Sequence, residues 1–142
     1  MNMITSFEIQ IAVLIFIQLF ISDTGYFMYL NSNVVSLFTN ITVMRSQSFQ
    51  LSQEACFTFW YHMYGSTMGS LNVYLETDGY IDKTWNVTGN QRDTWHQAAL
   101  NINTEDVFVI KFEGIRGDGM YSDIALDDIM LTPGTCAGKY SF

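Results

Sequence analysis

The sequence predicts an all-β fold in which two antiparallel sheets pack face to face as a sandwich. Short segments with alternating apolar residues recur along the chain, separated by turn signals roughly every 8–12 residues, a spacing typical of a sandwich or barrel. Aromatic residues make up 15% and apolar residues 49% of the 142 residues, and the frequent Tyr, Phe, Thr and Val favour strands. At this length the chain holds one domain at most.

The first strands of the domain are expected at Tyr26–Leu30 and Val34–Phe38, because the polar residues between them form a turn signal. Two weaker candidates follow at Asn40–Arg45 and Ser48–Leu51, which polar residues separate. Together these segments predict a series of short strands in the first third of the chain.

The middle of the chain carries stronger strand patterns. Cys56–His62 has aromatic residues on both faces, so we expect a central strand that is covered on each side. Residues 71–75 alternate apolar and polar side chains, the pattern of a half-exposed strand. Asp78-Gly79 is a tight-turn signal and predicts a hairpin with Tyr80–Val87. The next strand is expected at Trp95–Ile102.

The longest patterned stretch is Val107–Leu131. Phe108, Ile110 and Phe112 share one face, the two-residue period that a half-buried strand requires. Three glycines then supply a turn, and the apolar alternation resumes at Ile124. We therefore expect a hairpin of two strands whose apolar face is covered by the rest of the chain.

The charge of the chain excludes two classes of partner. Fourteen acidic and six basic residues give a formal net charge of −8. Phosphate contacts need clustered Lys and Arg, so nucleic acid is not an expected partner. An acidic domain is equally unsuited to docking on anionic lipid.

The N-terminal segment, residues 1–24, is a candidate secretory leader. Its apolar run from Ile11 to Phe20 is too short to span a bilayer, which takes about 20 apolar residues. The length suits the hydrophobic region of a signal peptide, and no membrane insertion of the mature domain is expected. Glu8 and the lack of a preceding Lys or Arg argue against a signal peptide, and a buried strand or helix is the alternative.

The two cysteines and two glycosylation sequons bear on the cellular compartment. The sequons make Asn40 and Asn86 candidate glycosylation sites and support an oxidising environment. In that environment Cys56 and Cys136 could form a disulfide, whereas elsewhere they would be buried free thiols.

Several blocks of the chain resemble, in the same order, the MAM domain family of extracellular modules. The family's C-terminal signature resembles FEGIRGDGMYSDIALDDI (112–129), and its central block resembles CFTFWYHMYGSTMGSLNVYL (56–75). An earlier strand of the module resembles residues 25–30, and its closing segment resembles residues 134–136. Further single positions match in order at Trp85, Gly89, Gln91, Trp95 and Ala98.

This resemblance implies a jelly-roll type of sandwich over residues 25–138, followed by a short tail at 139–142. It also implies a disulfide between Cys56 and Cys136. A full member of the family has further N-terminal strands with their own cysteine pair, and here the apolar leader stands in their place. The resemblance therefore implies a sandwich that is incomplete at its N-terminus.

Five carboxylates are expected to crowd one end of the final hairpin: Glu113, Asp118, Asp123, Asp127 and Asp128. Clustered hard oxygen ligands suit Ca²⁺, which takes 6–8 oxygens. Some members of the resembled family hold a cation near the acidic positions that match Asp127 and Asp128, so Ca²⁺ is a candidate cofactor there. The alternative is a solvated acidic rim in which a side chain caps nearby backbone amides.

Arg116-Gly117-Asp118 spells the tripeptide that integrin ligands use, on a turn expected to be exposed. These residues are a candidate interaction site, although the pattern of the resembled family already accounts for Arg116 and Gly117. Enzymatic motifs are absent from the sequence. A catalytic pair of Cys56 and His62 would require an unbridged cysteine.

The resemblance implies a non-catalytic extracellular module, secreted or at the cell surface, that binds protein partners or itself within a larger receptor or secreted protein. One alternative is a calcium-dependent carbohydrate-binding or enzyme-accessory jelly roll, and another is a non-functional truncated product. Exposed tryptophans along a concave sheet would favour carbohydrate, whereas burial of Trp60, Trp85 and Trp95 would favour adhesion.

Overall fold

The computed structural model describes residues 2–3, 7–10, 20–22, 25–30, 40–119 and 121–136, with side chains described from residue 40 onward. All regular structure in these ranges is β, so they include no helix long and apolar enough to cross a membrane. The strands are β1 (Asn2–Met3), β2 (Phe7–Gln10), β3 (Phe20–Ser22), β4 (Gly25–Leu30), β5 (Ile41–Ser46), β6 (Ala55–Met63), β7 (Ser70–Thr77), β8 (Tyr80–Thr88), β9 (His96–Ile102), β10 (Phe108–Ile115) and β11 (Ile124–Pro133).

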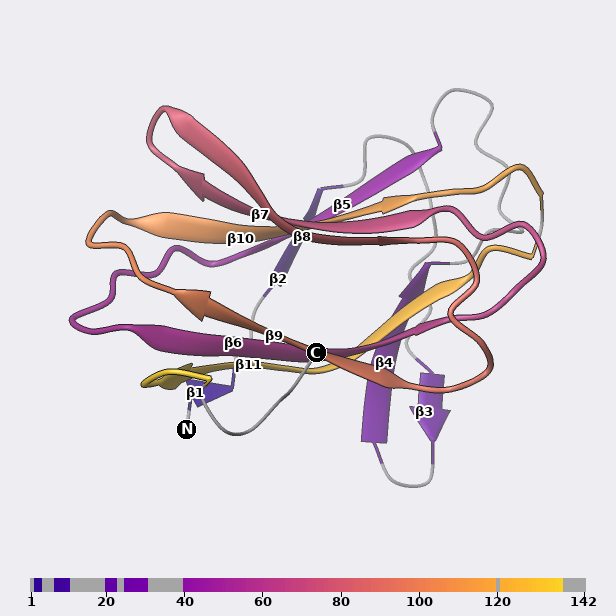
Figure 1. Cartoon of the computed structure of the whole chain (residues 1–142), viewed down its shortest axis with the longest axis horizontal. Helices are drawn as coiled ribbons and strands as arrows, with labels where there is room; N and C mark the ends of the chain where they lie inside the picture. The colour runs from indigo at the N-terminus through magenta and orange to yellow at the C-terminus, as the bar shows by residue number, and fades with distance from the viewer. Residues whose placement is uncertain are drawn as a thin grey trace.

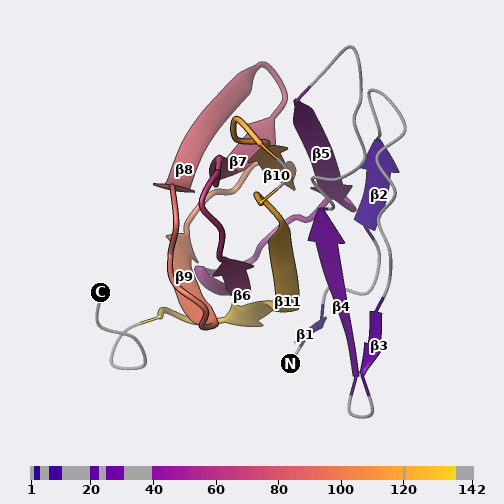
Figure 2. The ribbon, with the colours of Figure 1, turned by 90° about the vertical axis from the view of Figure 1, so that its right-hand side faces the viewer.

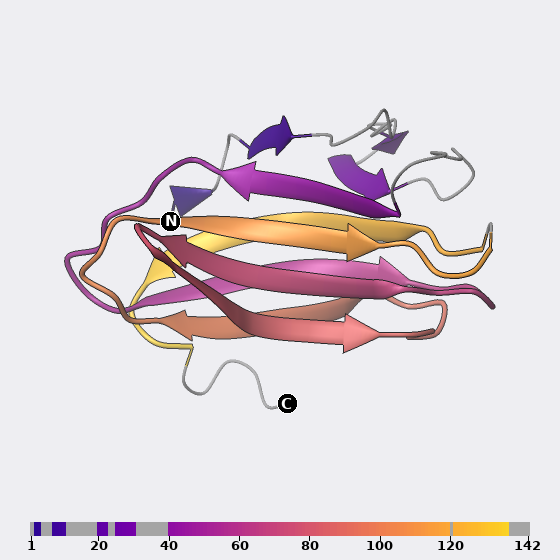
Figure 3. The same cartoon turned by 90° about the horizontal axis from the view of Figure 1, so that it is seen from above.

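The described strands form two antiparallel sheets that pack face to face (Figure 1). Sheet A has the order β3-β4-β11-β6-β9, and β1 pairs in addition with β11. Sheet B has the order β2-β5-β10-β7-β8. Figure 2 shows the two layers, with β7, β8 and β10 above β6, β9 and β11. Figure 3 looks onto sheet B, where β5, β10, β7 and β8 lie side by side. The predicted two-sheet sandwich of jelly-roll type is confirmed.

The predicted hairpin at Asp78-Gly79 is also confirmed. β7 and β8 pair along their whole length, from Ser70 opposite Thr88 to Thr77 opposite Tyr80, with a bulge near Val73. The turn needs a residue with positive φ, and Gly79 supplies it at +82°.

The predicted hairpin within 107–131 is wrong. β10 pairs with β5 and β7 in sheet B, whereas β11 pairs with β4 and β6 in sheet A. Both strands point apolar side chains at the same core, but they do so from opposite sides. The segment between them crosses from one sheet to the other. An alternating pattern says which face of a strand is buried, and it does not say which strand lies beside it.

Aromatic rings from the two sheets meet in the core. Phe57 and Phe59 of β6 face Phe112 of β10, with ring centroids 5.9 and 5.1 Å apart. Trp85 of β8 packs edge-on against Phe59 at 5.1 Å, and Phe59 is fully buried. β6 is central in sheet A, as predicted, because it lies between β11 and β9.

The outer face of β6 is covered only in part, which corrects the expectation that both faces are covered. Cys56 and Thr58 are buried on this outer face. Trp60 and His62, which follow on the same face, are only half-buried. The C-terminal half of β6, next to the loops that join the two sheets, is therefore the part whose outer face is open to solvent.

Two of the loops that connect one sheet to the other, the loop after β6 and the loop after β10, are in close backbone contact. A Cβ on Gly117 would overlap the carbonyl oxygen of Thr67, and a Cβ on Gly69 would overlap the carbonyl oxygen of Ile115. The loop after β6 and the loop after β10 therefore pack backbone to backbone at one end of the sandwich, which we call the loop end.

The N-terminal strands fall inside the proposed leader. β2 pairs with β5, β1 with β11, and β3 with β4. The division of the chain at residue 24 and the cleavage of a leader stay predictions. The strand expected at Val34–Phe38 lies outside the described residues. Of the segment Ser48–Leu51, only Phe49 forms a β-bridge, with Phe108.

Candidate interaction surface

Four aromatic side chains gather on the outer face of sheet A at the loop end, and we call them the aromatic patch: Trp60, His62, Tyr64 and Trp95. The imidazole of His62 lies 5.5 Å from the ring of Trp95 and 6.5 Å from that of Tyr64. Tyr64 is 54% and Trp95 37% exposed. Rigid aromatic side chains that are open to solvent are the anchors that protein interfaces favour.

Strand alternation produces the patch. Phe59, Tyr61 and Met63 of β6 point into the core, so the residues between them must point outward. His62 is fixed further by Asp93, whose carboxylate oxygen lies 3.0 Å from the imidazole Nε2. The patch was not predicted from the sequence, although the outward-facing positions of β6 were the signal that could have found it.

The three tryptophans do not behave alike. Trp85 points inward and packs against Phe59 and Tyr61, each at 5.1 Å between ring centroids. Trp60 is half-buried, and Trp95 lies at the rim of sheet A. The described tryptophans therefore do not line one concave sheet.

The outer face of sheet B carries an ion-pair network in place of an aromatic patch. Glu76 accepts a hydrogen bond from Arg45 at 2.9 Å and lies 3.0 Å from the amine of Lys111. Burial raises the pKa of the Glu76 carboxyl, but the hydrogen bonds and charges of Arg45 and Lys111 outweigh it, so the net pKa is lowered.

Tyr74 lies at the centre of the same face. The amine of Lys111 lies 4.3 Å from its ring centroid and that of Lys83 lies 5.5 Å away, both within cation–π range. Glu113 accepts hydrogen bonds from the Tyr74 hydroxyl at 3.0 Å and from the Asn72 amide at 2.9 Å. These polar groups bind one another, which favours a structural role for this face.

The two sequon asparagines are both exposed. Asn86 lies on β8 opposite Asn72, which places it on the outer face of sheet B. Asn40 lies directly before β5, and its carbonyl accepts a hydrogen bond from the Arg116 amide at 2.8 Å. Both side chains are accessible for a glycan, and glycosylation of each stays a prediction.

The tripeptide Arg116-Gly117-Asp118 lies in the crossing between β10 and β11. The Arg116 guanidinium is half-buried and donates to the carbonyl of Gly119 at 3.4 Å. Gly117 is held against Thr67, and Asp118 is exposed. Arg116 thus has a contact within its own loop and Gly117 has one with the loop after β6, and integrin-type binding stays a prediction.

The acidic residues do not crowd one end of a hairpin, because Glu113 is on the outer face of sheet B and Asp127 is on the outer face of sheet A. In the described residues no group of three or more His, Cys, Asp or Glu side chains is placed to hold a metal. Asp127 pairs with Trp60, and β11 has a bulge directly after it, between Asp127 and Met130. The Asp128 amide donates to the Asp127 carboxylate at 2.8 Å, the backbone capping that was the alternative to Ca²⁺.

Replacement of Asp127 by asparagine is expected to change how stability depends on pH. Burial raises the pKa of the Asp127 carboxyl, and the hydrogen bond from Asp128 opposes this only in part. A raised pKa in the folded state means that the carboxyl contributes its full stability below the unfolded pKa, about 3.9, and loses it as pH rises through the folded pKa. An asparagine side chain at this position would not titrate and would still accept the Asp128 hydrogen bond.

Urea unfolding of both proteins from about pH 3 to pH 8 measures this effect. The Asp127→Asn variant should gain stability relative to the native protein as pH rises. A difference that is the same at every pH would contradict the burial of the ionised carboxylate. The same series with added CaCl₂ tests the cation site, since Ca²⁺ binding should stabilise only the protein that retains Asp127.

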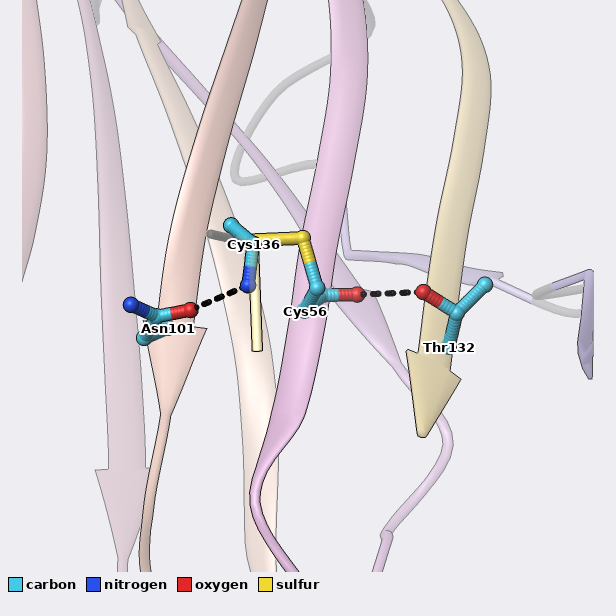
Figure 4. The surroundings of a disulfide bond; sticks show 4 residues. All are labelled: Cys56, Asn101, Thr132 and Cys136. Atoms are coloured by element: carbon cyan, nitrogen blue, oxygen red, sulfur yellow. Dashed lines mark hydrogen bonds between the residues drawn. A yellow bond between two sulfur atoms is a disulfide. The ribbon is translucent and has the colours of Figure 1, made fainter. Parts of the chain in front are cut away.

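Cys56 and Cys136 form a disulfide, as the family resemblance implied, with Cα atoms 5.0 Å apart (Figure 4). Two hydrogen bonds flank it. The Cys136 amide donates to the Asn101 side chain at 2.7 Å, and the Thr132 hydroxyl donates to the Cys56 carbonyl at 3.3 Å. The bond links β6 to the segment after β11. A bridged Cys56 is not available as a nucleophile for His62.

A small cleft of about 200 Å³ opens between the edge strands β8 and β9. The residues of its lining that carry polar groups are Tyr74, Asp82, Thr84, Asn101 and Asn103. Leu75, Leu100 and other apolar side chains complete the lining. The cleft is lined by residues 100–103 at the end of β9, whereas Trp95 of the aromatic patch lies before the start of that strand.

The chain belongs to the MAM domain family (meprin/A5/mu), whose model matches residues 18–137. It is therefore an extracellular or cell-surface module. The family match begins at residue 18, before residue 25, where the sequence pattern predicts the start of the domain.

The chain is similar to larger proteins that carry this domain. It is 35% identical over 128 residues to MAM domain-containing glycosylphosphatidylinositol anchor protein 2 of Mus musculus, covering 82% of this chain and 14% of that protein. It is 36% identical over 118 residues to thyroid hormone-induced protein B of Xenopus laevis, covering 81% of this chain and 17% of that protein. The chain thus spans a small part of the length of these relatives.

Solved structures share the fold at low sequence identity. TmCBM61, solved in complex with β-1,4-galactotriose, has a TM-score of 0.61 at 13% identity, with 93% of this chain and 91% of that chain covered. The K3 adhesin domain of Lys-gingipain from Porphyromonas gingivalis has a TM-score of 0.59 at 14% identity, with 77% and 74% covered. At such identities the likeness concerns the fold alone.

Proposed function

We propose that the chain is a non-catalytic interaction module that binds a protein partner through the aromatic patch. The observation that carries this proposal is the exposure of Tyr64 and Trp95 beside His62 on a face built from rigid strands. Tyr64 and Trp95 lie directly beside strand ends, after β6 and before β9, so their backbone is held by the neighbouring strands and they lose little conformational entropy on binding.

The charge of the chain favours a partner other than a second copy. At a net charge of −8, two copies repel each other, whereas a partner with a basic contact surface is attracted. Asp93 adds a carboxylate at the edge of the patch, 74% exposed, where a basic side chain of the partner could pair with it.

A tetramerised, fluorescent form of the secreted chain tests the proposal on a panel of cell lines. Trp95→Ala and Tyr64→Ala should each weaken cell binding about tenfold or more, the effect of losing an interface anchor. Tyr80→Ala is the matched control, because Tyr80 is 63% exposed but lies on the other sheet, at the start of β8, and its variant should bind as the native chain does.

The remaining arms identify the class of partner. Trypsin treatment of the cells should abolish binding and glycosidase treatment should not, and rising salt should weaken binding. The proposal would be contradicted if the Trp95→Ala and Tyr64→Ala variants bound the cells as strongly as the native chain does. A chain that is monomeric in sedimentation equilibrium and binds none of the cell lines would also contradict the proposal. If the chain instead forms dimers that the Trp95 and Tyr64 substitutions disrupt, its partner is a second copy of itself.

The cleft between β8 and β9 supports a second candidate function, the binding of a neutral sugar. Its amide and hydroxyl groups are suited to sugar hydroxyls, and its apolar lining is suited to the carbon face of a sugar ring. In this case Asp82→Ala and Asn103→Ala would weaken cell binding, glycosidase would remove it, and Trp95→Ala would leave it unchanged.

A further inference from the structure

The buried face of β5 contains a hydroxyl group without a hydrogen-bond partner. Thr42, Met44 and Ser46 point inward along this strand, and Thr42 is only 7% exposed. Among the buried side-chain nitrogen and oxygen atoms of the described residues, the Thr42 hydroxyl oxygen alone lacks a partner. Buried polar groups are nearly always paired, so this exception needs a physical explanation.

Ser46, at the other end of the same face, shows how a buried hydroxyl is normally accommodated. Its oxygen accepts a hydrogen bond from the Ile110 amide at 2.9 Å, and its proton is donated to the Gln47 carbonyl at 2.8 Å. Thr42 makes neither kind of contact and so loses its bonds to water without replacing them. Valine has nearly the same shape and would fill the site without this loss, so the fold itself does not call for threonine.

The glycosylation sequon explains why residue 42 is a threonine, which the fold does not require. Thr42 is the third residue of Asn40-Ile41-Thr42, and a hydroxyl at this position is what makes Asn40 an acceptor for an N-linked glycan. We propose that Asn40 is glycosylated before β5 folds, and that Thr42 is retained in the core for this recognition at the expense of stability. The proposal does not depend on the aromatic patch.

Burial determines the order of events. Asn40 stays exposed in the folded domain, but Thr42 does not, so a transferase that reads both residues must meet the extended chain. The Asn40 side-chain nitrogen forms a bond to the anomeric carbon of a lipid diphosphate-linked oligosaccharide. The bond from that carbon to the phosphate oxygen breaks, the lipid diphosphate leaves with the electron pair, and one amide proton passes to a base of the transferase.

Site occupancy in cells tests the modification. The 142-residue chain is directed into the secretory pathway by an added signal peptide, and whole cells are lysed so that secretion is not required. Enzymatic glycan removal in ¹⁸O-water, followed by mass spectrometry, reports the glycosylated fraction at residue 40. The native chain and Thr42→Ser should carry the glycan, and Thr42→Val should not. Asn86 in the same molecules is the internal control and should be unaffected.

Thermal unfolding tests whether the Thr42 hydroxyl lowers the stability of the folded domain. All chains in this comparison lack the glycan at residue 40. Adding Thr42→Val to Asn40→Gln should raise the melting temperature by about 2–5 °C, because the unpaired hydroxyl is removed from the core. Adding Ser46→Ala to Asn40→Gln should lower it, because the Ile110 amide loses its acceptor.

Two results would overturn the proposal independently. An unmodified Asn40 in the native chain would show that the sequon is not read. A melting temperature that Thr42→Val leaves unchanged or lowers would show that the hydroxyl contributes to the folded domain, so that its presence needs no further explanation.

Discussion

Replacement of Phe59 by alanine is expected to lower the free energy of unfolding by about 3–5 kcal/mol, the range measured for large aromatic side chains in protein cores. Phe59 is fully buried, and its ring contacts the rings of Phe57, Trp85 and Phe112. The last two belong to sheet B, so the cavity would open between the sheets, where neither can move inward without losing its strand pairing. Urea unfolding followed by tryptophan fluorescence measures the loss.

Tyr80→Ala is the matched control for this substitution. Its ring is 63% exposed, so its loss should change the free energy of unfolding by no more than about 0.5 kcal/mol. If the two variants unfolded at the same urea concentration, Phe59 would not be the contact that holds the two sheets together.

Removal of the disulfide by the double substitution Cys56→Ser and Cys136→Ser should lower the free energy of unfolding by about 4 kcal/mol. The two residues are 80 positions apart, so the bond restricts a long stretch of the unfolded chain. Changing both cysteines together avoids leaving a buried free thiol that could form other disulfides.

Reductant provides the control for the disulfide prediction. Dithiothreitol should lower the stability of the native chain to that of the double variant, and it should leave the variant unchanged. Urea unfolding measures the stability, and a count of free thiols shows that the disulfide has been reduced. A native chain that keeps its stability after reduction would contradict a stabilising role for the bond.

The strands were predictable from the sequence wherever a two-residue period coincided with a turn signal. The hairpin of β7 and β8 needed only residues 71–75, the turn at Asp78-Gly79 and the strand after it, all of which are local. Phe108, Ile110 and Phe112 likewise indicated the buried face of β10. In each case the information lies within a few residues of the element that it specifies.

The partners of β10 and β11 could not be read in the same way. A strand followed by a glycine-rich segment and a second strand describes a hairpin and a crossing between sheets equally well. The contacts that decide between them, such as Gly117 against Thr67, join residues far apart in the sequence. The error about the strands also produced the error about the carboxylates, because it placed Glu113 on the same sheet as Asp127.

The aromatic patch was missed because burial is a property of the assembled sheets. Trp60 and Trp85 look alike in the sequence, since each lies within an expected strand. Only the pairing of β6 and β8 shows that Trp85 points into the core while Trp60 faces outward. The pair of His62 and Asp93 depends in the same way on a contact across 31 residues.

The disulfide also determines how the domain would respond to mechanical force. Tension between the chain before Cys56 and the chain after Cys136 passes through the sulfur–sulfur bond and bypasses the segment between them. Strands β6 to β11 lie almost wholly in that bypassed segment, and all four residues of the aromatic patch lie within it. Pulling can therefore peel away β1 to β5, but it cannot draw out the strands that carry the proposed contact surface.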